Sequence, residues 1–537
     1  MRDSSKTLAG KFFSENGWIS LAAAAGFSWR LWLSQATFLN TDEAWHFSVA
    51  NQESIGAALH ASHTLAHPPL LVLVLYFWKA VGTSELVLRL PGVIAGTLFC
   101  CVFFLWLKLL FGRATAWCGF LLVTFLPPMI ALTVELRQYS WMLLFATTAA
   151  YLLERALLEN SQRWMLFSFS ALYLAMLSHY SAFLFAAGLG IYAIHRMVLD
   201  RPAFRVAAFW VAGQVVGVTL AFVLYKTHIA KLGSVYPAGQ PLHRFGDFYL
   251  SDWYFHPGRD HLAHFLFRGT LGVFRFIFGQ TAIGQFAAFA FLFALVLQCL
   301  KRATPGQKSP PQTMVTLFAL PFLLNWIAVL SGLYPYGRTR QCIFLAVFAL
   351  AGVSVAISCL VRDRVVASVA VALCLALVCN LWGTLQGRDM LPLADQRRAH
   401  MEQAIEFIRT EISPSDVLLT DMATSFQLRH YLCNQKPVKT SASMNGLETF
   451  NCGGLQVFFT GAHDGALTPQ FVYSRQQEFV NPALAGSSQR LWVMQAGWAS
   501  GLGEALRGAH PDFATVRIES FGRFIEIFEL PAYAASR

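Results

Sequence analysis

The stretch from Val87 to Leu110, VLRLPGVIAGTLFCCVFFLWLKLL, decides the class of fold. It holds only two charged residues, Arg89 and Lys108, one near each end. About 20 predominantly apolar residues are enough for a helix to cross the hydrocarbon core of a bilayer. The stretch therefore predicts a transmembrane helix, and the rest of the chain can be judged against it.

The composition of the whole chain agrees with a membrane protein. Hydrophobic residues make up 56% of the 537 residues and charged residues 13%, whereas soluble globular proteins carry about 25% charged residues. The mean hydropathy is +0.49. These values exclude a purely soluble enzyme, a disordered chain and a fibrous repeat. The net charge is +11, from 40 Lys and Arg against 29 Asp and Glu. We assign the excess to cytoplasmic loops and not to nucleic-acid binding.

Ten further apolar stretches are predicted to span the membrane, which makes eleven spans in all. The full set is Trp18–Gln35, Val87–Leu110, Ala114–Leu132, Ser140–Leu157, Trp164–Leu177, Ser181–Val198, Phe204–Leu224, Ala282–Leu300, Thr313–Leu333, Cys342–Leu360 and Val365–Leu385. The apolar stretch Leu70–Val81 is short for a span. We expect it to be a juxtamembrane or re-entrant helix on the outer face.

The positions of Lys and Arg support this topology. If Leu70–Val81 does not cross and the N-terminus is inside, fifteen Lys and Arg fall in six inside segments. If it did cross, every later loop would change sides and the positive-inside bias would be lost. We therefore expect a multi-pass protein of a bacterial-type inner (plasma) membrane, without a cleavable signal. Its N-terminus would be cytoplasmic, and the first loop, the large loop after Leu224 and the C-terminal tail would lie outside.

The tail, residues 386–537, differs in character from the transmembrane domain of residues 1–385. Its apolar runs have the length of strands, at Val417–Thr420, Leu455–Phe459, Leu491–Met494, Val516–Ile518 and Phe524–Phe528, and helix-like stretches lie at Gln396–Thr410 and Met422–Leu432. This pattern predicts a small extracytoplasmic α/β domain. Cys433 and Cys452 could form a disulfide there, because that compartment is oxidising. The other eight cysteines lie in apolar stretches and are interpreted as small hydrophobic residues.

Two acidic residues, Asp42 and Glu43, directly follow the first span. A carboxylate beside an apolar wall gains basicity, so this pair could supply a general base. The alternative is structural, with Thr41 or Asp42 capping the helix that follows. His67 precedes Pro68 and Pro69 at the entry of the short outer helix, where it could donate a hydrogen bond or bind a metal, or simply be exposed.

Cationic and aromatic residues form a second set at the expected outer rim. A guanidinium can merely snorkel to the interface, but it is also the preferred ligand for phosphate. Positive charge at the outer rim runs against the topological bias, which favours a function. The residues are Arg89, Arg137, Tyr139, His179, Arg338 and Arg340. Arg137 and Tyr139 would need a turn to face the same side.

Metal binding has weak support in the sequence. His261 and His264 are three residues apart and could share one helix face, and His67 is a further candidate. A histidine-rich interfacial loop is the more common explanation of such a stretch. A divalent metal is therefore an optional cofactor in this interpretation, and no cofactor is required by the sequence.

The order of these outer motifs resembles that of a known group of enzymes. The motifs are Asp42-Glu43, His67-Pro68-Pro69-Leu70, Gly82-Thr83-Ser84-Glu85-Leu86, Arg89-Leu90-Pro91 and Arg137-Gln138-Tyr139. Together they resemble the protein O-mannosyltransferase-like and lipid A aminoarabinose transferase-like glycosyltransferases of the GT-C fold. The resemblance covers roughly Arg30 to Tyr180, is looser from Tyr334 to Leu345, and does not reach the tail.

The resemblance implies an inverting glycosyltransferase whose donor is a sugar on a polyprenyl phosphate. The residue matching Asp42 would take a proton from the acceptor hydroxyl as that oxygen attacks the sugar C1. The leaving polyprenyl phosphate would be stabilised by Arg89, Arg137, Arg338 and Arg340, with help from His67 and His179, or by a metal. The acceptor would be a lipid, a glycan or a protein.

The chain also departs from these families. Ala66-His67 stands where the aminoarabinose branch has Glu-Lys, which weakens any transfer of that branch's metal site. Ser140 and Trp141 stand where some members carry a second Asp. The tail lacks the β-trefoil module that eukaryotic O-mannosyltransferases insert. Alternatives to a transferase are a lipid-linked glycan polymerase, a flippase or transporter, and a binding or sensing protein. Transporters usually carry intramembrane carboxylates and broken spans in matching halves, which this sequence lacks.

Overall fold

The computed structural model divides into two compact units. Unit 1 comprises residues 1–32, 63–71 and 89–391, and unit 2 comprises residues 33–62, 72–88 and 392–537. The residues that the structure describes are 15–232, 250–303, 307, 310–386, 396–433, 441–442, 447–460, 467–473, 490–496, 501–509 and 513–530. Unit 2 thus joins the tail to two segments from the N-terminal part of the chain, whereas the composition alone suggests one boundary near residue 386.

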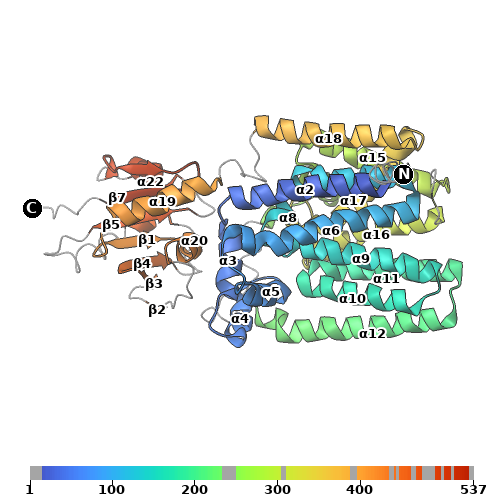
Figure 1. Cartoon of the computed structure of the whole chain (residues 1–537), viewed down its shortest axis with the longest axis horizontal. Helices are drawn as coiled ribbons and strands as arrows, with labels where there is room; N and C mark the ends of the chain where they lie inside the picture. The colour runs from blue at the N-terminus through green and yellow to red at the C-terminus, as the bar shows by residue number, and fades with distance from the viewer. Residues whose placement is uncertain are drawn as a thin grey trace, which may run out of the picture. The chain divides into compact units, whose positions relative to one another are not determined.

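Unit 1 is a bundle of apolar helices that run roughly side by side (Figure 1). Its helices are α2 (Glu15–Ala36), α6 (Glu85–Phe111), α7 (Arg113–Phe125), α8 (Pro127–Val134), α9 (Tyr139–Leu158), α10 (Gln162–Ser178), α11 (Ser181–Asp200), α12 (Phe204–Thr227), α14 (Leu262–Phe278), α15 (Thr281–Cys299), α16 (Pro311–Leu330), α17 (Leu345–Leu360) and α18 (Val365–Gln386). Helices α2 and α6 and the short helix α5 (Leu70–Trp78) each begin in one unit and end in the other. The short 3-10 helix η4 (Arg340–Phe344) leads into α17.

All eleven predicted spans lie on helices of this bundle, but fewer of these helices are by themselves long and apolar enough to cross a membrane. Within the described residues, seven helices are long and apolar enough to cross a membrane, and the number rises to eight if a bent pair counts as one span. The bent pair is α7 and α8, which correspond to the predicted span Ala114–Leu132 and meet at 58°. That span is therefore not one continuous helix. Helix α14 has no counterpart among the predicted spans.

The break between α7 and α8 has a clear chemical cause. In a helix, each carbonyl accepts a hydrogen bond from the N–H four residues later. Pro127 and Pro128 have no N–H, so the carbonyls of Val123 and Thr124 lack their usual donors. Arg30, fully buried in α2, supplies donors instead. Its Nη2 lies 3.2 Å from the Val123 oxygen, and its Nη1 lies 3.1 Å from the Thr124 oxygen. The guanidinium therefore compensates for the two prolines, which explains a charge inside an apolar helix.

Burial separates central from peripheral helices in unit 1. The apolar part of the stretch Arg340–Leu360 is 89% buried, whereas that of Phe204–Lys231 is 11% buried. Helix α12 exposes large apolar side chains, including Val215, Val218 and Phe222. Without a bilayer such a surface would be unfavourable in water, so α12 has the character of a lipid-facing helix and α17 that of a core helix.

In unit 2 the tail forms the predicted α/β domain. The strands are β1 (Val417–Thr420), β2 (Ser441–Ala442), β3 (Leu447–Cys452), β4 (Leu455–Thr460), β5 (Leu491–Gln495), β6 (Ile518–Ser520) and β7 (Glu526–Leu530). Their order in the sheet is β2-β3-β4-β1-β5-β7-β6. The central pairs β4–β1 and β1–β5 are parallel, and the outer pairs are antiparallel. All five predicted strands are present in whole or in part, and β2 and β3 were not predicted.

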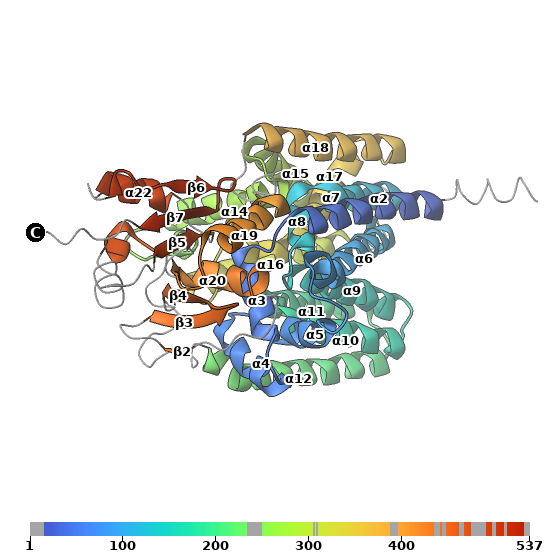
Figure 2. The same cartoon turned by 60° about the vertical axis from the view of Figure 1, so that its left-hand side comes forward.

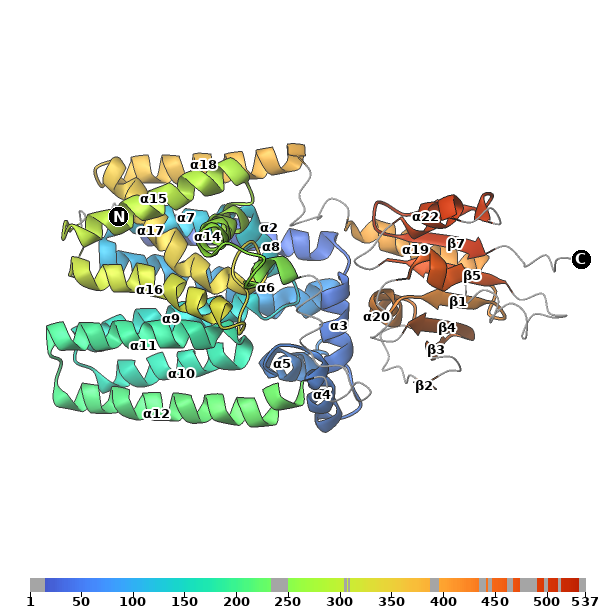
Figure 3. The same ribbon diagram turned by 180° about the vertical axis from the view of Figure 1, so that it is seen from behind.

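Helices cover both faces of this sheet (Figures 2 and 3). Helices α19 (Arg398–Glu411) and α20 (Met422–Tyr431) pack on one face, where Leu418 and Val457 contribute to the core. Helix α22 (Leu502–Ala509) packs on the other face with Leu419 and Val493. Consecutive strand residues therefore enter opposite cores, as expected for a two-sided central sheet. The loop between the first two predicted spans, Trp18–Gln35 and Val87–Leu110, contains four short helical segments. These are α3 (Thr41–Ala50), α4 (Ile55–Ala61), η1 (Ser62–Thr64) and α5 (Leu70–Trp78).

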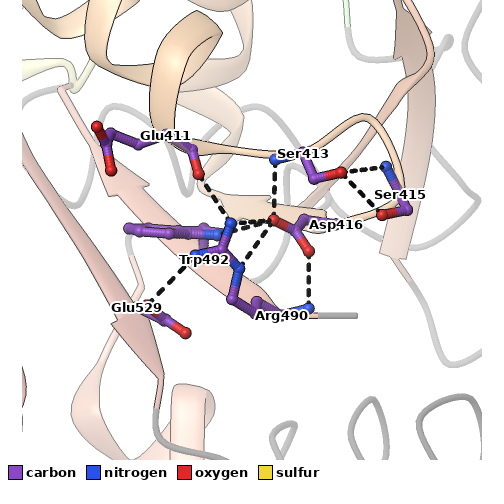
Figure 4. A network of polar contacts seen from close by, with 7 residues as sticks. All are labelled: Glu411, Ser413, Ser415, Asp416, Arg490, Trp492 and Glu529. Atoms are coloured by element: carbon purple, nitrogen blue, oxygen red, sulfur yellow. Dashed lines mark hydrogen bonds and ion pairs between the residues drawn. The ribbon is translucent and has the colours of Figure 1, made fainter. Parts of the chain in front are cut away.

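A buried carboxylate ties the start of the sheet together (Figure 4). Asp416, 2% exposed, accepts from the backbone N–H groups of Ser413 and Arg490, both at 2.9 Å. The Arg490 side chain lies 3.0 Å away and Trp492 Nε1 lies 3.3 Å away. These donors hold the pKa of the Asp416 carboxyl below its usual value, against the opposing effect of burial. A disulfide joins Cys433 to Cys452, the pair that the oxidising compartment suggested.

Candidate functional site

The acidic pair Asp42 and Glu43 lies in the first turn of α3, in unit 2. The helix is capped by Asn40 and not by Thr41 or Asp42. Asn40 Oδ1 accepts from the Glu43 N–H at 3.0 Å, and Glu43 Oε2 accepts from the Asn40 N–H at 2.9 Å. This reciprocal pair is a capping box. It engages the fully buried carboxylate of Glu43, whereas Asp42, 8% exposed, lies outside the box.

The turn between α8 and α9 brings Arg137 and Tyr139 together in unit 1. Helix α8 ends at Val134 and α9 begins at Tyr139, so the residues between them are not helical. The Arg137 N–H donates to the Glu135 oxygen at 2.7 Å, which tightens the turn. The guanidinium carbon then lies 5.5 Å from the centroid of the Tyr139 ring, and Nη2 lies 3.5 Å from its hydroxyl. This is the turn that the spacing of the two residues required.

His67 and His179 complete a cluster around Arg137. Arg137 Nη2 donates to His67 Nε2 at 3.4 Å, so that nitrogen accepts and carries no proton. The rings of His67 and His179 stack with centroids 5.0 Å apart, and the Tyr139 ring lies 5.3 Å from that of His179. Four of the predicted site residues therefore meet in one place, although they come from three separate parts of the sequence. We call these four residues the cation cluster.

The protonation state of His179 can be assigned from its neighbours. The backbone N–H of Ser181 donates to His179 Nδ1 at 3.1 Å, so Nδ1 accepts and the neutral ring carries its proton on Nε2. Burial, and secondly the charge of Arg137, lower the pKa of His179 to about 3. His179 Nε2 is buried and has no hydrogen-bond partner within the described residues. A buried N–H donor therefore points to an acceptor that the chain itself does not provide.

Gln138, beside Arg137, repeats this signal. It is 1% exposed, and neither its amide oxygen nor its amide nitrogen has a partner among the residues that the structure describes. Ser140 Oγ is likewise buried without a hydrogen-bond partner among the described residues. The sequence analysis assigned no role to Gln138, Ser140 or Ser181, because none of them carries a charge. The sequence signals available were the motif Arg137-Gln138-Tyr139 and the positions of the two serines close to Arg137 and His179.

The predicted turn from Tyr334 to Gln341 lies against the same part of unit 1. Arg340 Nη1 is 3.6 Å from Glu135 Oε2, two residues from Arg137. Helix α14 packs tightly on this turn, because a Cβ on Gly272 would lie 2.8 Å from the Arg338 nitrogen. The structure therefore places Arg340 beside the α8–α9 turn and fixes Arg338 against α14. The Glu135 carboxylate partly neutralises the Arg340 guanidinium, so Arg340 attracts an anionic ligand less strongly than an unpaired arginine would.

Arg89 is buried in α6, 2% exposed. One turn later Gly92 permits close approach to the start of α9, since a Cβ there would lie 3.5 Å from both Ser140 Oγ and the Glu135 oxygen. Arg89 and the α8–α9 turn are therefore neighbours through Gly92.

The candidate metal ligands are not gathered into a site within the described residues. His261 is the residue before α14 and His264 lies in its first turn, and both are exposed. Across the described ranges, no group of three or more His, Cys, Asp or Glu side chains is placed to hold a metal ion. His67 instead accepts from Arg137, a cation that disfavours a metal ion beside it.

The comparisons with known proteins give one partial family match. Residues 66–225 match the model of the dolichyl-phosphate-mannose-protein mannosyltransferases. This range includes His67, Arg89, Arg137, Tyr139 and His179, and it excludes Asp42 and the tail. None of the curated proteins matches the chain by sequence.

The solved structures give a match over the whole chain. ArnT from Cupriavidus metallidurans, bound to undecaprenyl phosphate, is similar with a TM-score of 0.54 and 14% identity, over 98% of this chain and 100% of that one. The archaeal oligosaccharyltransferase AglB from Archaeoglobus fulgidus, in complex with an inhibitory peptide and a dolichol-phosphate, gives 0.44 and 13%, over 78% and 64%. The chain is thus a multi-pass membrane protein with the GT-C fold of ArnT, and residues 66–225 resemble the dolichyl-phosphate-mannose-protein mannosyltransferases.

Proposed function

We propose that this protein transfers a sugar from a polyprenyl-phosphate carrier to an acceptor hydroxyl at the outer face of the membrane. The observation that carries the proposal is the buried Nε2–H of His179, which has no partner among the described residues and lies in the same cluster as the guanidinium of Arg137. A neutral donor and a fixed cation in one buried place favour an anionic oxygen as the missing partner. A lipid phosphate supplies such oxygens, and the polyprenyl-phosphate ligand of ArnT gives the fold a precedent.

In the proposed reaction the acceptor oxygen attacks C1 of the donor sugar. Asp42 takes the proton of the acceptor hydroxyl, the bond between C1 and the phosphate oxygen breaks, and the configuration at C1 inverts. The bond electrons leave with the polyprenyl phosphate, whose growing negative charge is stabilised by Arg137 and by hydrogen bonds from the cation cluster. Glu43 holds the helix cap instead of acting as a second base.

The other predicted residues receive supporting roles. Arg89 and Arg338 contribute positive potential near the leaving group, and Arg340 contributes less because Glu135 pairs with it. Tyr139 fixes Arg137 through its ring and hydroxyl. The proposal also includes an inner-membrane location, a cytoplasmic N-terminus and a tail on the outer side, as the charge bias predicts.

Binding of undecaprenyl phosphate tests the proposal directly. In the purified full-length protein, Arg137→Gln should raise the dissociation constant about 10- to 100-fold, because a charge-assisted hydrogen bond contributes about 1.5–3 kcal/mol. His179→Ala should weaken binding in the same direction. Arg155→Gln is the matched control, since Arg155 lies at the far end of α9 in a solvent-exposed ion pair. Equal affinity of the wild type and Arg137→Gln would contradict the proposed site. A lipid-linked sugar moved across liposomes without bond cleavage would instead support a transporter.

A further inference from the structure

The backbone before α3 depends on the tail for its hydrogen bonds. Helix α2 ends at Ala36 and α3 begins at Thr41, so the residues between them lack helical partners. Leu39 is fully buried, and buried backbone groups must be paired. Its N–H donates to the hydroxyl of Tyr431 at 2.7 Å, and its carbonyl accepts from Gln427 Nε2 at 3.1 Å. Both side chains come from α20, so both backbone groups of Leu39 are held by one helix of the tail.

Tyr431 is itself fixed by a buried carboxylate. Its hydroxyl donates to Glu85 Oε1 at 3.0 Å while it accepts from Leu39, so both functions of the hydroxyl are used. Glu85 is 4% exposed, and Arg398 of α19 lies 3.7 Å from its other oxygen. A chain of polar contacts thus runs from Leu39 through Tyr431 to Glu85 and Arg398. Such a chain fixes the tyrosine hydroxyl in one orientation.

Three further contacts join α3 and the residues before it to the tail. Trp45 of α3 stacks on Phe426 of α20 with ring centroids 5.5 Å apart and planes within 7°. Phe47 meets the edge of His430, also in α20, at 5.4 Å. The Phe38 N–H donates to the Gln396 oxygen at 3.0 Å, just before α19. Helix α3 is therefore attached to the tail through Trp45 and Phe47 and through the backbone that directly precedes the turn carrying Asp42.

We infer that Tyr431 and Gln427 are positioning residues that hold the Leu39–Asn40 backbone and thereby fix Asp42. The inference rests on the proposed function, in which Asp42 is the base. Asp42 follows Leu39 by three residues, and the capping box begins at the intervening Asn40. A displacement of Leu39 therefore passes directly into the first turn of α3. The tail would then serve catalysis by setting the geometry of the base, in addition to whatever it binds.

The test compares single side-chain changes in the full-length protein in liposomes. Tyr431→Phe removes the hydroxyl from Leu39 and Glu85, and Gln427→Met removes one donor at similar side-chain length. Each should lower kcat about 10- to 100-fold, as a small misplacement of a catalytic group does. The KM for the lipid donor should stay close to the wild-type value. Amide exchange at Leu39, followed by mass spectrometry, should become faster in Tyr431→Phe.

Tyr473→Phe is the matched control, because Tyr473 packs on the opposite face of the sheet against Phe513. It should leave kcat and the exchange at Leu39 unchanged. If Tyr431→Phe and Gln427→Met have the same kcat as Tyr473→Phe, the inference is overturned. If Tyr431→Phe does not fold, the comparison of Gln427→Met with Tyr473→Phe decides the question. Asp42→Asn is measured in the same series. Full activity of that variant would show that the proposed base is wrong, whereas an inactive Asp42→Asn with an active Tyr431→Phe would refute only the positioning role.

Discussion

The guanidinium of Arg30 donates to the carbonyl oxygen of Thr124 at 3.1 Å, across 94 positions of sequence. The carbonyl would normally accept from the residue four positions on, which is Pro128 and has no N–H. Arg30 Nε also donates to Thr133 Oγ1 at 2.8 Å, on the far side of the break. One buried side chain therefore holds both halves of the bent pair that leads to Arg137.

Arg30→Met should destabilise unit 1 by several kcal/mol, because each buried carbonyl that loses its donor costs about 1–3 kcal/mol. The melting temperature of the detergent-solubilised protein measures the effect. Arg163→Met, at an exposed site over the Phe167 ring, is the control and should change little. The cost of Arg30→Met should shrink in a Pro127→Ala background, which restores one N–H. An equal cost in both backgrounds would argue against this role of Arg30.

The pKa of His179 near 3 gives a pH dependence of known sign. The native ring stays neutral, while an unfolded histidine takes up a proton near pH 6.5. The unfolded state binds more protons, so this residue should make stability fall as the pH drops from about 6.5 toward 3. Melting temperatures of His179→Asn over that range should fall less steeply than those of the wild type. The exposed His261→Asn should reproduce the wild-type slope, and identical slopes in all three proteins would contradict the assignment.

Asp416 should stabilise the tail through its bound donors. Asp416→Asn should cost about 2 kcal/mol, in the range of hydrogen bonds to charged groups. Because the folded pKa lies below the unfolded value, the contribution is present above about pH 4 and is lost as the pH falls through the lowered pKa. Urea denaturation followed by the tryptophan signal of the tail measures it. Glu529→Gln, at 4.0 Å from Arg490 and 40% exposed, should change little, and an equal loss in both variants would refute the role.

The capping box should respond differently to its two side chains. Asn40→Ala should lower the free energy of unfolding by about 1 kcal/mol, the usual cost of losing an N-cap. Glu43→Gln should cost less, because a glutamine oxygen can still accept the Asn40 N–H. Thermal melts of both variants compare the two effects. A greater loss in Glu43→Gln would show that the charge of Glu43 has another task.

Much of the fold is predictable from local sequence, because apolar length and strand-length runs are local properties. The limits are equally physical. Helix α14 was missed because Arg268 and Arg275 interrupt its apolar run, and β3 because Glu448, Thr449 and Asn451 lie within it. The spacing of Asn40 and Glu43 fits a capping box, so the correct N-cap could have been found. In contrast, no sequence pattern links Arg30 to Thr124, or Leu39 to Tyr431, since both contacts depend on the folded chain.

The candidate site was predictable to the same degree. Charge against the topological bias singled out Arg137, the order of motifs singled out His67, and the expected outer turn singled out His179. The unpartnered groups of Gln138 and Ser140 could not be predicted, because burial of an uncharged residue is a property of packing. The pairing of Arg340 with Glu135 was also unforeseen, because it depends on how the turn from Tyr334 to Gln341 packs on the α8–α9 turn.

The most direct test is sugar transfer by Asp42→Asn in liposomes, with undecaprenyl-phosphate-linked sugars as donors and release of undecaprenyl phosphate as the readout. Asparagine keeps the shape of the side chain but cannot accept the proton. The kcat of Asp42→Asn should fall about 10²- to 10⁴-fold. Binding of undecaprenyl phosphate should be unchanged. Transfer by Asp42→Asn at the wild-type rate would show that Asp42 is not the general base.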